Sequence, residues 1–499
     1  MSWEDSLMSN QVKSTIFNVT EFGAVPDGWT LSTKAFAAAI EAAASQGGGT
    51  VYVPAGVYLT GPIVLKSHIN LHLDSGAIIR FSQNIADYPL VKSRWEGVDR
   101  LVYSPMIFGE DAENISVTGR GILDGQGEFW WKEFRAKNLE YPRPRLISFS
   151  QSKNILIEGL TMINSPAWTI NPINCQNLTV DKITIKNPAD SPNTDGINPE
   201  SCQNVHISNC HVDVGDDCIT LKSGTEECSE RIPCENITIT NCTMVHGHGG
   251  VVIGSEMSGG VRNVVISNCV FEGTDRGIRL KTRRGRGGLV EDIRVTNIIM
   301  KNVITPFVMG MFYFCGPGGK EEYVWDKNPH PVTEKTPIFR RLHFSNITAR
   351  EVAASAGFFY GLPEMPIEDI TFDNISVHLA DDPEPAVPSM MSFLEPMAKH
   401  GFFCCNVKNI SFNNVQVINN VGPAFEARSC DNVEFSRCSM INGPADQPVI
   451  QMTKVTRGFV QGCQVSADAP VFLELNEMDR DDVEMAGNRV KPEQIRINK

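Results

Sequence analysis

The 499-residue chain contains no apolar run long enough to cross a lipid bilayer. Met1 to Ser14 also lacks an apolar stretch of signal-peptide length and carries Glu4 and Asp5. We therefore expect a cytoplasmic protein that does not associate with membranes. A form from which a signal had been removed would look the same and would instead be secreted.

Positive charge is scarce, because 44 Lys and Arg residues face 58 Asp and Glu residues and give a formal net charge of −14. A field of this sign repels acidic polymers at long range, so we expect no nucleic-acid partner. An acidic substrate would need a local basic patch to hold it. Nothing in the composition indicates an oligomeric state.

Cys-x-x-Cys pairs are absent among the 14 cysteines, which argues against a zinc site. Five of the cysteines fill a recurring position that Ile, Leu or Val fills elsewhere, so they are interpreted as small hydrophobic residues. We expect neither a metal ion nor a cofactor. Cys228, Cys234, Cys404 and Cys405 lie outside that position, and a disulfide among them stays open for an exported protein.

Short segments with the pattern Asn-apolar-polar-apolar-polar-Asn-apolar recur along most of the chain. Most of the recurrences are 23 to 32 residues apart, while gaps of 49 and 40 residues indicate insertions or an unrecognised coil. Alternating strands with a period in the twenties are typical of a β-solenoid, whose stacked coils bury a continuous core. The sequence therefore predicts an all-β, right-handed parallel β-helix. The recurring position is filled by Leu160, Ile183, Cys210, Cys242, Cys269, Ile298, Ile347, Ile375, Val415, Cys438 and Cys463.

The ends of the chain differ from the repeat. Ser32 or Thr33 can cap a helix that carries Phe36 and Ile40 on one face, and we expect this helix to cover the open end of the solenoid. The predicted organisation is a cap with the first strands over 1–85, continuous with a catalytic solenoid over 86–475. A charged cap or tail follows over 476–499, because the repeat is lost beyond about Leu475.

Four polar clusters follow one another in the middle of the repeat, about one coil apart. Since strands of adjacent coils lie roughly 4.8 Å apart, stacking brings the clusters into one patch. The paired aspartates must lie at a bend, because a regular strand would drive one of them into the core. The clusters are Asn193-Thr194-Asp195-Gly196, Gly215-Asp216-Asp217, Gly247-His248-Gly249 and Arg279-Leu280-Lys281.

Clustered carboxylates raise at least one pKa, so that one group keeps a proton while another stays ionised. Glycoside hydrolysis needs such an acid and base. Arg279 and Lys281 alternate along a strand and can face the carboxylate of an acidic sugar. Each cluster alone is compatible with an ordinary turn, but all four in register favour a catalytic site. Arg283, Arg284 and Arg286, which follow, are interpreted as a solvated turn.

The order NTDG, GDD, GHG and RxK resembles the polygalacturonase family, glycoside hydrolase family 28, and in particular its bacterial exo-polygalacturonases. This resemblance implies a right-handed parallel β-helix and an inverting mechanism. It implies that Asp216 is the general acid, that Asp195 and Asp217 hold the nucleophilic water, and that His248 supports the acid.

By the same resemblance, Arg279 and Lys281 bind the galacturonate carboxylate at the cleaved linkage. Asn193 is assigned to substrate binding with its cluster. The family's tyrosine in the following coil has no clear motif here, and Tyr313, flanked by Phe312 and Phe314, is the nearest candidate.

The resemblance implies hydrolysis of α-1,4-linked galacturonic acid in polygalacturonate or oligogalacturonides. We expect exo attack from the non-reducing end, because Gly310 to Pro337 could close one end of the cleft. The alternatives are a rhamnogalacturonan hydrolase, a calcium-dependent pectate lyase and a non-catalytic, carbohydrate-binding β-helix.

Overall fold

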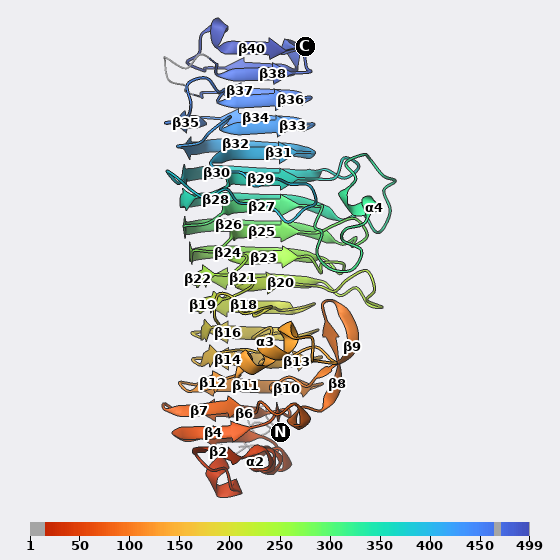
Figure 1. Cartoon of the computed structure of the whole chain (residues 1–499), viewed down its shortest axis with the longest axis vertical. Helices are drawn as coiled ribbons and strands as arrows, with labels where there is room; N and C mark the ends of the chain where they lie inside the picture. The colour runs from red at the N-terminus through yellow and green to blue at the C-terminus, as the bar shows by residue number, and fades with distance from the viewer. Residues whose placement is uncertain (1–14, 464–470, 499) are drawn as a thin grey trace, which may run out of the picture.

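The computed structural model describes residues 15–463 and 471–498, which form one tall column of stacked coils (Figure 1). Strands of each coil pair in parallel with the equivalent strands of the next coil. The protein is thus a right-handed parallel β-helix, which confirms the predicted fold class. None of the described helices is long and apolar enough to cross a membrane.

Most described strands belong to one sheet that wraps two sides of the column. They are β1 (Ile16–Asn18), β2 (Asp27–Leu31), β3 (Gly49–Val53), β4 (Gly56–Thr60), β6 (Ile69–Leu73), β7 (Ala77–Phe81), β11 (Glu113–Gly119), β12 (Ile122–Asp124), β14 (Lys153–Glu158), β15 (Thr161–Ile163), β16 (Gln176–Asp181), β17 (Thr184–Lys186), β18 (Gln203–Ser208), β19 (His211–Val214), β21 (Cys234–Thr240), β22 (Thr243–His246), β24 (Val261–Glu272), β26 (Leu289–Lys301), β28 (Ile338–Val352), β30 (Ile367–Leu379), β32 (Val407–Ile418), β34 (Asp431–Ser436), β35 (Ser439–Ile441), β37 (Thr456–Gln461) and β39 (Val483–Ala486).

Another side of the column carries the strand with the Arg279-Leu280-Lys281 cluster and the strands that follow the bends at the paired aspartates and at His248. An antiparallel hairpin projects beside them. The strands of this side are β5 (Ile63–Val64), β10 (Ile107–Glu110), β13 (Ile147–Ser150), β20 (Ile219–Leu221), β23 (Val251–Gly254), β25 (Arg276–Lys281), β27 (Thr305–Gly310), β29 (Ser355–Tyr360), β31 (His400–Cys405), β33 (Phe425–Arg428), β36 (Ile450–Thr453), β38 (Leu473–Asn476) and β40 (Ile495–Asn498). The hairpin is β8 (Leu90–Trp95) and β9 (Val98–Tyr103). Helices and 3-10 turns are α2 (Thr33–Ser45), α3 (Gly127–Arg135), α4 (Glu322–Trp325), η1 (Val19–Phe22), η2 (Ile85–Asp87), η3 (Arg480–Asp482) and η4 (Pro492–Gln494).

Like side chains stack in files inside the column, because each inward position recurs at the same place in every coil. The rings of Phe344 and Phe372 stack with centroids 4.8 Å apart, and Phe372 stacks on Phe412 at 5.2 Å. The predicted recurring position is such a file, since Cys269, Ile298 and the residues that follow pair in register. All 14 cysteines lie in the described part of the chain and are free, and those of the file are buried.

The asparagines that precede this file form a ladder of side-chain hydrogen bonds between coils. Asn346, Asn374 and Asn414 adopt left-handed backbone with φ of 53° to 54°, and the side-chain amides of Asn374 and Asn414 each donate to the asparagine of the preceding coil. A second ladder, which the sequence did not reveal, borders the same sheet and is built in the same way. Its members are Asn114, Asn154, Asn177, Asn204, Asn236 and Asn263.

The two long gaps in the repeat are insertions and not missed coils. Ile298 pairs directly with Ile347, and Ile375 pairs directly with Val415. The inserted residues 311–337, which include α4, project from the side of the column that carries β25 and β27 (Figure 1).

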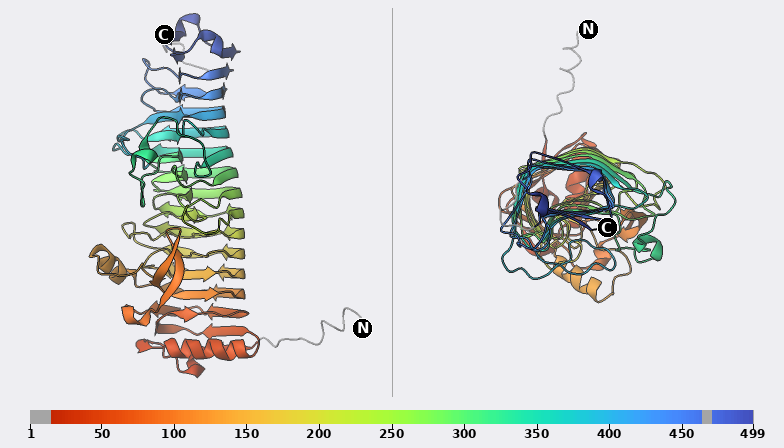
Figure 2. Two further views of the ribbon diagram at one scale, coloured as in Figure 1. Left: turned by 90° about the vertical axis from the view of Figure 1, so that its right-hand side faces the viewer. Right: turned by 90° about the horizontal axis from the view of Figure 1, so that it is seen from above.

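The ends of the column are closed differently. Helix α2 lies across the N-terminal end and buries Phe36 and Ile40, as predicted (Figure 2). The predicted Ser32 cap is wrong in detail, because its hydroxyl donates to Thr30 O and accepts from Val25 N instead of capping the helix.

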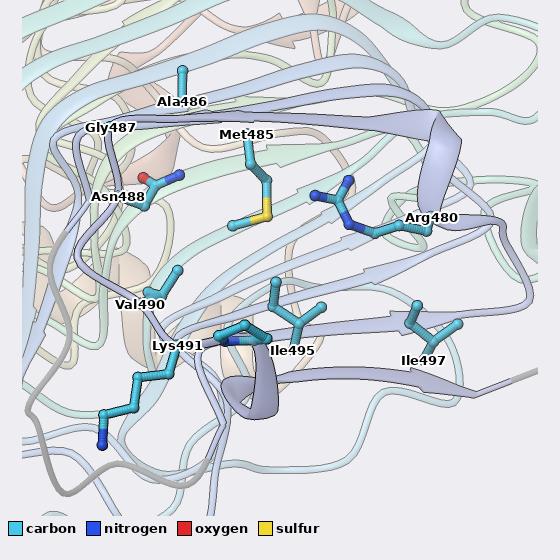
Figure 3. Close-up of a pocket in the computed structure, with 10 residues that line it drawn as sticks. Arg480, Met485, Ala486, Gly487, Asn488, Val490, Lys491, Ile495 and Ile497 are labelled. Carbon is cyan, nitrogen blue, oxygen red and sulfur yellow. The ribbon is translucent and has the colours of Figure 1, made fainter.

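At the other end, strand pairing continues past Leu475, where the sequence predicted the loss of the repeat. β40 pairs with β38, and β39 pairs with β37. The pattern is weak there because the last coil has a neighbour on one side only, so polar side chains replace part of its apolar face. Met485, Val490 and Ile495 line an open surface pocket of about 540 Å³ at this end (Figure 3).

Candidate active site

Hydrogen bonds between coils place the polar clusters one above another. Gly196 N donates to Asp217 O at 3.0 Å, and Cys218 N donates to Gly249 O at 2.8 Å. The backbone bends over residues 215–217, as predicted, so neither aspartate of the pair enters the core as a strand residue would. The register therefore brings Asp195, Asp217 and the His248 loop together.

The glycines of the clusters are required by close contact between coils. A Cβ atom at Gly215 would lie 2.4 Å from Ser191 O, and one at Gly247 would lie 2.3 Å from Asp216 O, in each case in the preceding coil. These distances are far below van der Waals contact, so a larger residue would push the coils apart at the site.

Asp195, Asp216 and Asp217 each place a carboxylate oxygen within 4.8 Å of the other two. They line a pocket of about 310 Å³, near the lower limit of about 300 Å³ for small-molecule sites. Asp195 and Asp217 are only 3% and 2% exposed. The close approach that the sequence predicted for the three acids is therefore present.

Asp217 is held in its ionised form. Burial by itself raises its pKa, but Lys281 and Arg279 outweigh burial and lower the pKa to about 2. Lys281 Nζ donates to Asp217 Oδ2 at 2.7 Å, and Arg279 Nη1 lies 3.6 Å from Asp217 Oδ1. This carboxylate is thus a base at any pH near neutrality.

The pKa values of Asp195 and Asp216 are raised, in contrast to that of Asp217. Burial, followed by the charge of Asp216, raises the pKa of Asp195 to about 8. Burial, followed by the charge of Asp217, also raises the pKa of Asp216. The two groups therefore retain a proton between them under conditions in which Asp217 is ionised.

The surroundings favour Asp216 as the group that carries this proton. Asp195 Oδ2 accepts a hydrogen bond from Asn198 Nδ2 at 2.9 Å and lies 3.8 Å from Lys222 Nζ. Asp216 accepts only the backbone N–H of Asp217, at 2.9 Å, among the hydrogen bonds of the described residues. Once one proton is present, the charged form is better stabilised at Asp195.

His248 lies beside this group, half exposed, with Nδ1 2.8 Å from Asp275 Oδ2. The hydrogen bond to Asp275 raises the pKa of His248, and the charges of Asp216 and Asp275 add to the effect against burial. Asp275 fixes the orientation of the ring, and the sequence did not reveal this role.

The remaining predicted residues also line the pocket. Arg279 and Lys281 face it from β25, while Leu280 between them is fully buried. The ring centroid of Tyr313 lies 5.4 Å from Lys281 Nζ and 5.8 Å from Arg279 Cζ. Asn193 Oδ1 accepts a hydrogen bond from Arg143 Nη2 at 2.6 Å.

The interpretation of Arg283, Arg284 and Arg286 as a solvated turn is wrong. All three are at most 6% exposed, because the inserted segments fold over them. Arg283 and Arg286 pair with Glu226, and Arg284 pairs with Glu364. They anchor the loops that form the walls of the pocket.

Sequence reasoning missed Trp168, Lys222 and Glu256, which also line the pocket. A signal was available, because coils in register repeat at fixed offsets. Lys222 lies five residues after Asp217, and its bridge partner Glu200 lies five residues after Asp195. Lys281 occupies the equivalent level two coils further on, since it pairs with Gly254.

The three aspartates could also serve as ligands for one metal ion. Three ammonium or guanidinium groups already surround them, however, from Lys222, Arg279 and Lys281. These cations occupy positions that a divalent ion would need and repel it.

A family model described as glycosyl hydrolases family 28 matches residues 45–386. A probable polygalacturonase of Vitis vinifera is 37% identical over 375 residues, which cover 73% of this chain and 74% of the plant protein. The solved hyperthermoactive exopolygalacturonase of Thermotoga maritima is 33% identical with a TM-score of 0.66, covering 76% of this chain and 91% of that protein. The family 28 exopolygalacturonase of Yersinia enterocolitica has the same fold at 21% identity, with a TM-score of 0.64 over 91% of this chain and 79% of its own.

Proposed function

Because the chain belongs to glycosyl hydrolases family 28, we propose that it hydrolyses the α-1,4 linkages between galacturonate units in polygalacturonate or its oligomers. The observation that carries this proposal is the single pocket in which an acid, two carboxylates and a cationic pair meet. Hydrolysis of a glycosidic bond requires an acid and a base, and the cationic pair can bind the carboxylate of a uronate substrate.

In the proposed reaction, protonated Asp216 donates its proton to the glycosidic oxygen as the bond to the anomeric carbon breaks. Asp195 and Asp217 hold a water molecule, which attacks the anomeric carbon and transfers a proton to Asp195. One sugar leaves with a new hydroxyl group and the other gains the water oxygen, so one water is consumed per bond. His248 and Asp275 keep the acid oriented.

We propose that this attack inverts the anomeric carbon. Inverting pairs are usually about 6.5–9.5 Å apart, whereas the closest oxygens here lie within 4.8 Å. The short separation is compatible with inversion because the pocket has a third carboxylate. Asp195 and Asp217 can bind the water together while Asp216 lies beside the leaving oxygen.

The proposed mode of attack is exo, from the non-reducing end. The hairpin β8–β9 contributes Glu96 to the pocket, and residues 315–317 of the insertion contribute its opposite wall. Such walls leave room for a chain end and obstruct a continuous polymer.

Product analysis of a polygalacturonate digest tests this proposal. We expect monogalacturonate from the earliest times, with reducing ends but no unsaturated product, and proton NMR should show the inverted anomer first. Early tri- and tetragalacturonate would contradict exo attack, and an unsaturated product would indicate a lyase. A retained anomer would contradict the assigned water.

Replacing Lys281 by Ala should raise KM for trigalacturonate about tenfold or more, because a charge-assisted hydrogen bond contributes about 1.5–3 kcal/mol. The rate should also fall, because burial would then raise the pKa of Asp217 with less opposition. The exposed Lys301→Ala is the matched control. Steady-state kinetics measure both, and an unchanged KM and rate in Lys281→Ala would refute its role.

A further inference from the structure

One pair of charged side chains in the pocket has no assigned contact with the substrate in the proposed reaction. Lys222 Nζ lies 3.4 Å from Glu256 Oε2, and the two side chains are 8% and 13% exposed. Neither side chain has a hydrogen bond to another described residue, although both line the pocket. Groups this buried normally use their hydrogen-bonding capacity, so the pair points to a ligand.

Lys222 is held firmly in this position. Its ammonium lies 4.3 Å from the ring centroid of Trp168, whose other neighbour, Trp95, stacks on it at 4.6 Å with an interplanar angle of 15°. Asp195 Oδ2 is 3.8 Å from the same ammonium. A fixed ammonium with uncommitted N–H groups is preorganised to donate to a substrate oxygen.

Glu256 lies where the hairpin closes the pocket. Gly97, in the tip between β8 and β9, accepts hydrogen bonds at its carbonyl from Thr225 Oγ1 at 3.0 Å and Cys228 Sγ at 2.9 Å. A Cβ atom added at Gly97 would lie 3.1 Å from Glu256 Cγ, so the tip lies next to the Glu256 side chain. The pair therefore faces the closed end of the pocket.

The hydrogen-bonding groups of Glu256 and Lys222 favour sugar hydroxyl groups as ligands. Glu256 accepts and Lys222 donates, and a sugar hydroxyl can do both. A uronate carboxylate would be repelled by Glu256, whose pKa is lowered to about 2 because Lys222, Arg286 and Lys281 outweigh burial. A sugar in the closed end must be the last of its chain, and its 4-hydroxyl is free only at the non-reducing terminus.

We infer that Glu256 and Lys222 form a subsite that binds the hydroxyl groups of the terminal, non-reducing sugar through hydrogen bonds, including its 4-hydroxyl. This inference rests on the proposed exo hydrolysis and adds the residues that determine it. The pair would bind the chain end, while Arg279 and Lys281, which lie against Asp217, bind a carboxylate of the substrate.

The test compares trigalacturonate with a trimer whose non-reducing sugar is 4,5-unsaturated and lacks the 4-hydroxyl. The unmodified enzyme should cleave the saturated trimer with a kcat/KM about 10- to 100-fold higher, as expected for the loss of a charged hydrogen bond. Glu256→Gln should lower kcat/KM for the saturated trimer by a similar factor and bring the ratio of the two substrates close to one. A trimer reduced at its other end should be cleaved normally.

Glu227→Gln is the matched control, since Glu227 is exposed on the loop that contacts the hairpin and does not line the pocket. Lys222→Gln provides a second test if Glu256→Gln does not fold. An unmodified enzyme that cleaves both trimers equally, or a Glu256→Gln variant that keeps the full ratio, overturns the inference. Failure to release galacturonate from the saturated trimer would instead overturn the proposed function.

Discussion

Replacing Asp216 by Asn should reduce turnover of oligogalacturonide about 10²- to 10⁴-fold, the usual contribution of a general acid. The amide cannot protonate the leaving oxygen, and the other two aspartates both lie within 3.8 Å of a cationic side chain. The folded state should not be destabilised, because the neutral amide has the same charge as the protonated acid that it replaces, and its oxygen can still accept the hydrogen bond from Asp217 N. Single-turnover kinetics and thermal unfolding measure the two effects.

Asp213→Asn is the control for this experiment. Asp213 lies three residues earlier in the same coil and pairs with His246 outside the pocket. Turnover by the Asp213→Asn variant should equal that of the unmodified enzyme. If both variants lost activity equally, or if Asp216→Asn unfolded at a much lower temperature, the assignment of Asp216 as the acid would be wrong.

Replacing Arg284 by Ala should lower the free energy of unfolding by about 3–5 kcal/mol, because it leaves a buried carboxylate without its partner. Arg284 is 1% exposed and donates to both oxygens of Glu364, at 2.6 Å and 2.9 Å. It also donates to the carbonyl groups of Tyr323, Asp326 and Asn328 in the insertion. Denaturant unfolding measures the loss, and KM should rise because this insertion carries a wall of the pocket.

A double-mutant cycle separates the charge from the packing. Adding Glu364→Gln to Arg284→Ala should restore part of the stability, since the unpaired charge is then absent. Arg350→Ala, at an exposed position, should change stability by less than about 0.5 kcal/mol. A loss in Arg284→Ala no larger than in Arg350→Ala would show that the insertion is not anchored through this residue.

The solenoid and its central site could be predicted because both depend on register. Asn374 and Ile375 recur with the coil, so their ladder and core file are visible as a period. The same period places Asp195 and Asp217 together, and the same five-residue offset pairs Lys222 with Glu200.

Features outside the repeat could not be predicted in the same way. The hairpin β8–β9 contains Glu96 and Gly97, whose position depends on contacts with Thr225 and Cys228, more than 100 residues away in the chain. Arg284 lies in a run of basic residues that is typical of an exposed turn. Its burial depends on the distant Glu364 and on the carbonyl groups of the insertion. Such contacts follow from tertiary packing and leave no local pattern.

In the proposed mechanism, the three stacked aspartates surround one glycosidic linkage. A crystal structure of Asp216→Asn with bound trigalacturonate shows whether they do. We predict that the side chain at position 216 lies within hydrogen-bond distance of the glycosidic oxygen, with a water held between Asp195 and Asp217 near the anomeric carbon. A trimer whose linkages all lie beyond reach of these three residues would contradict this mechanism.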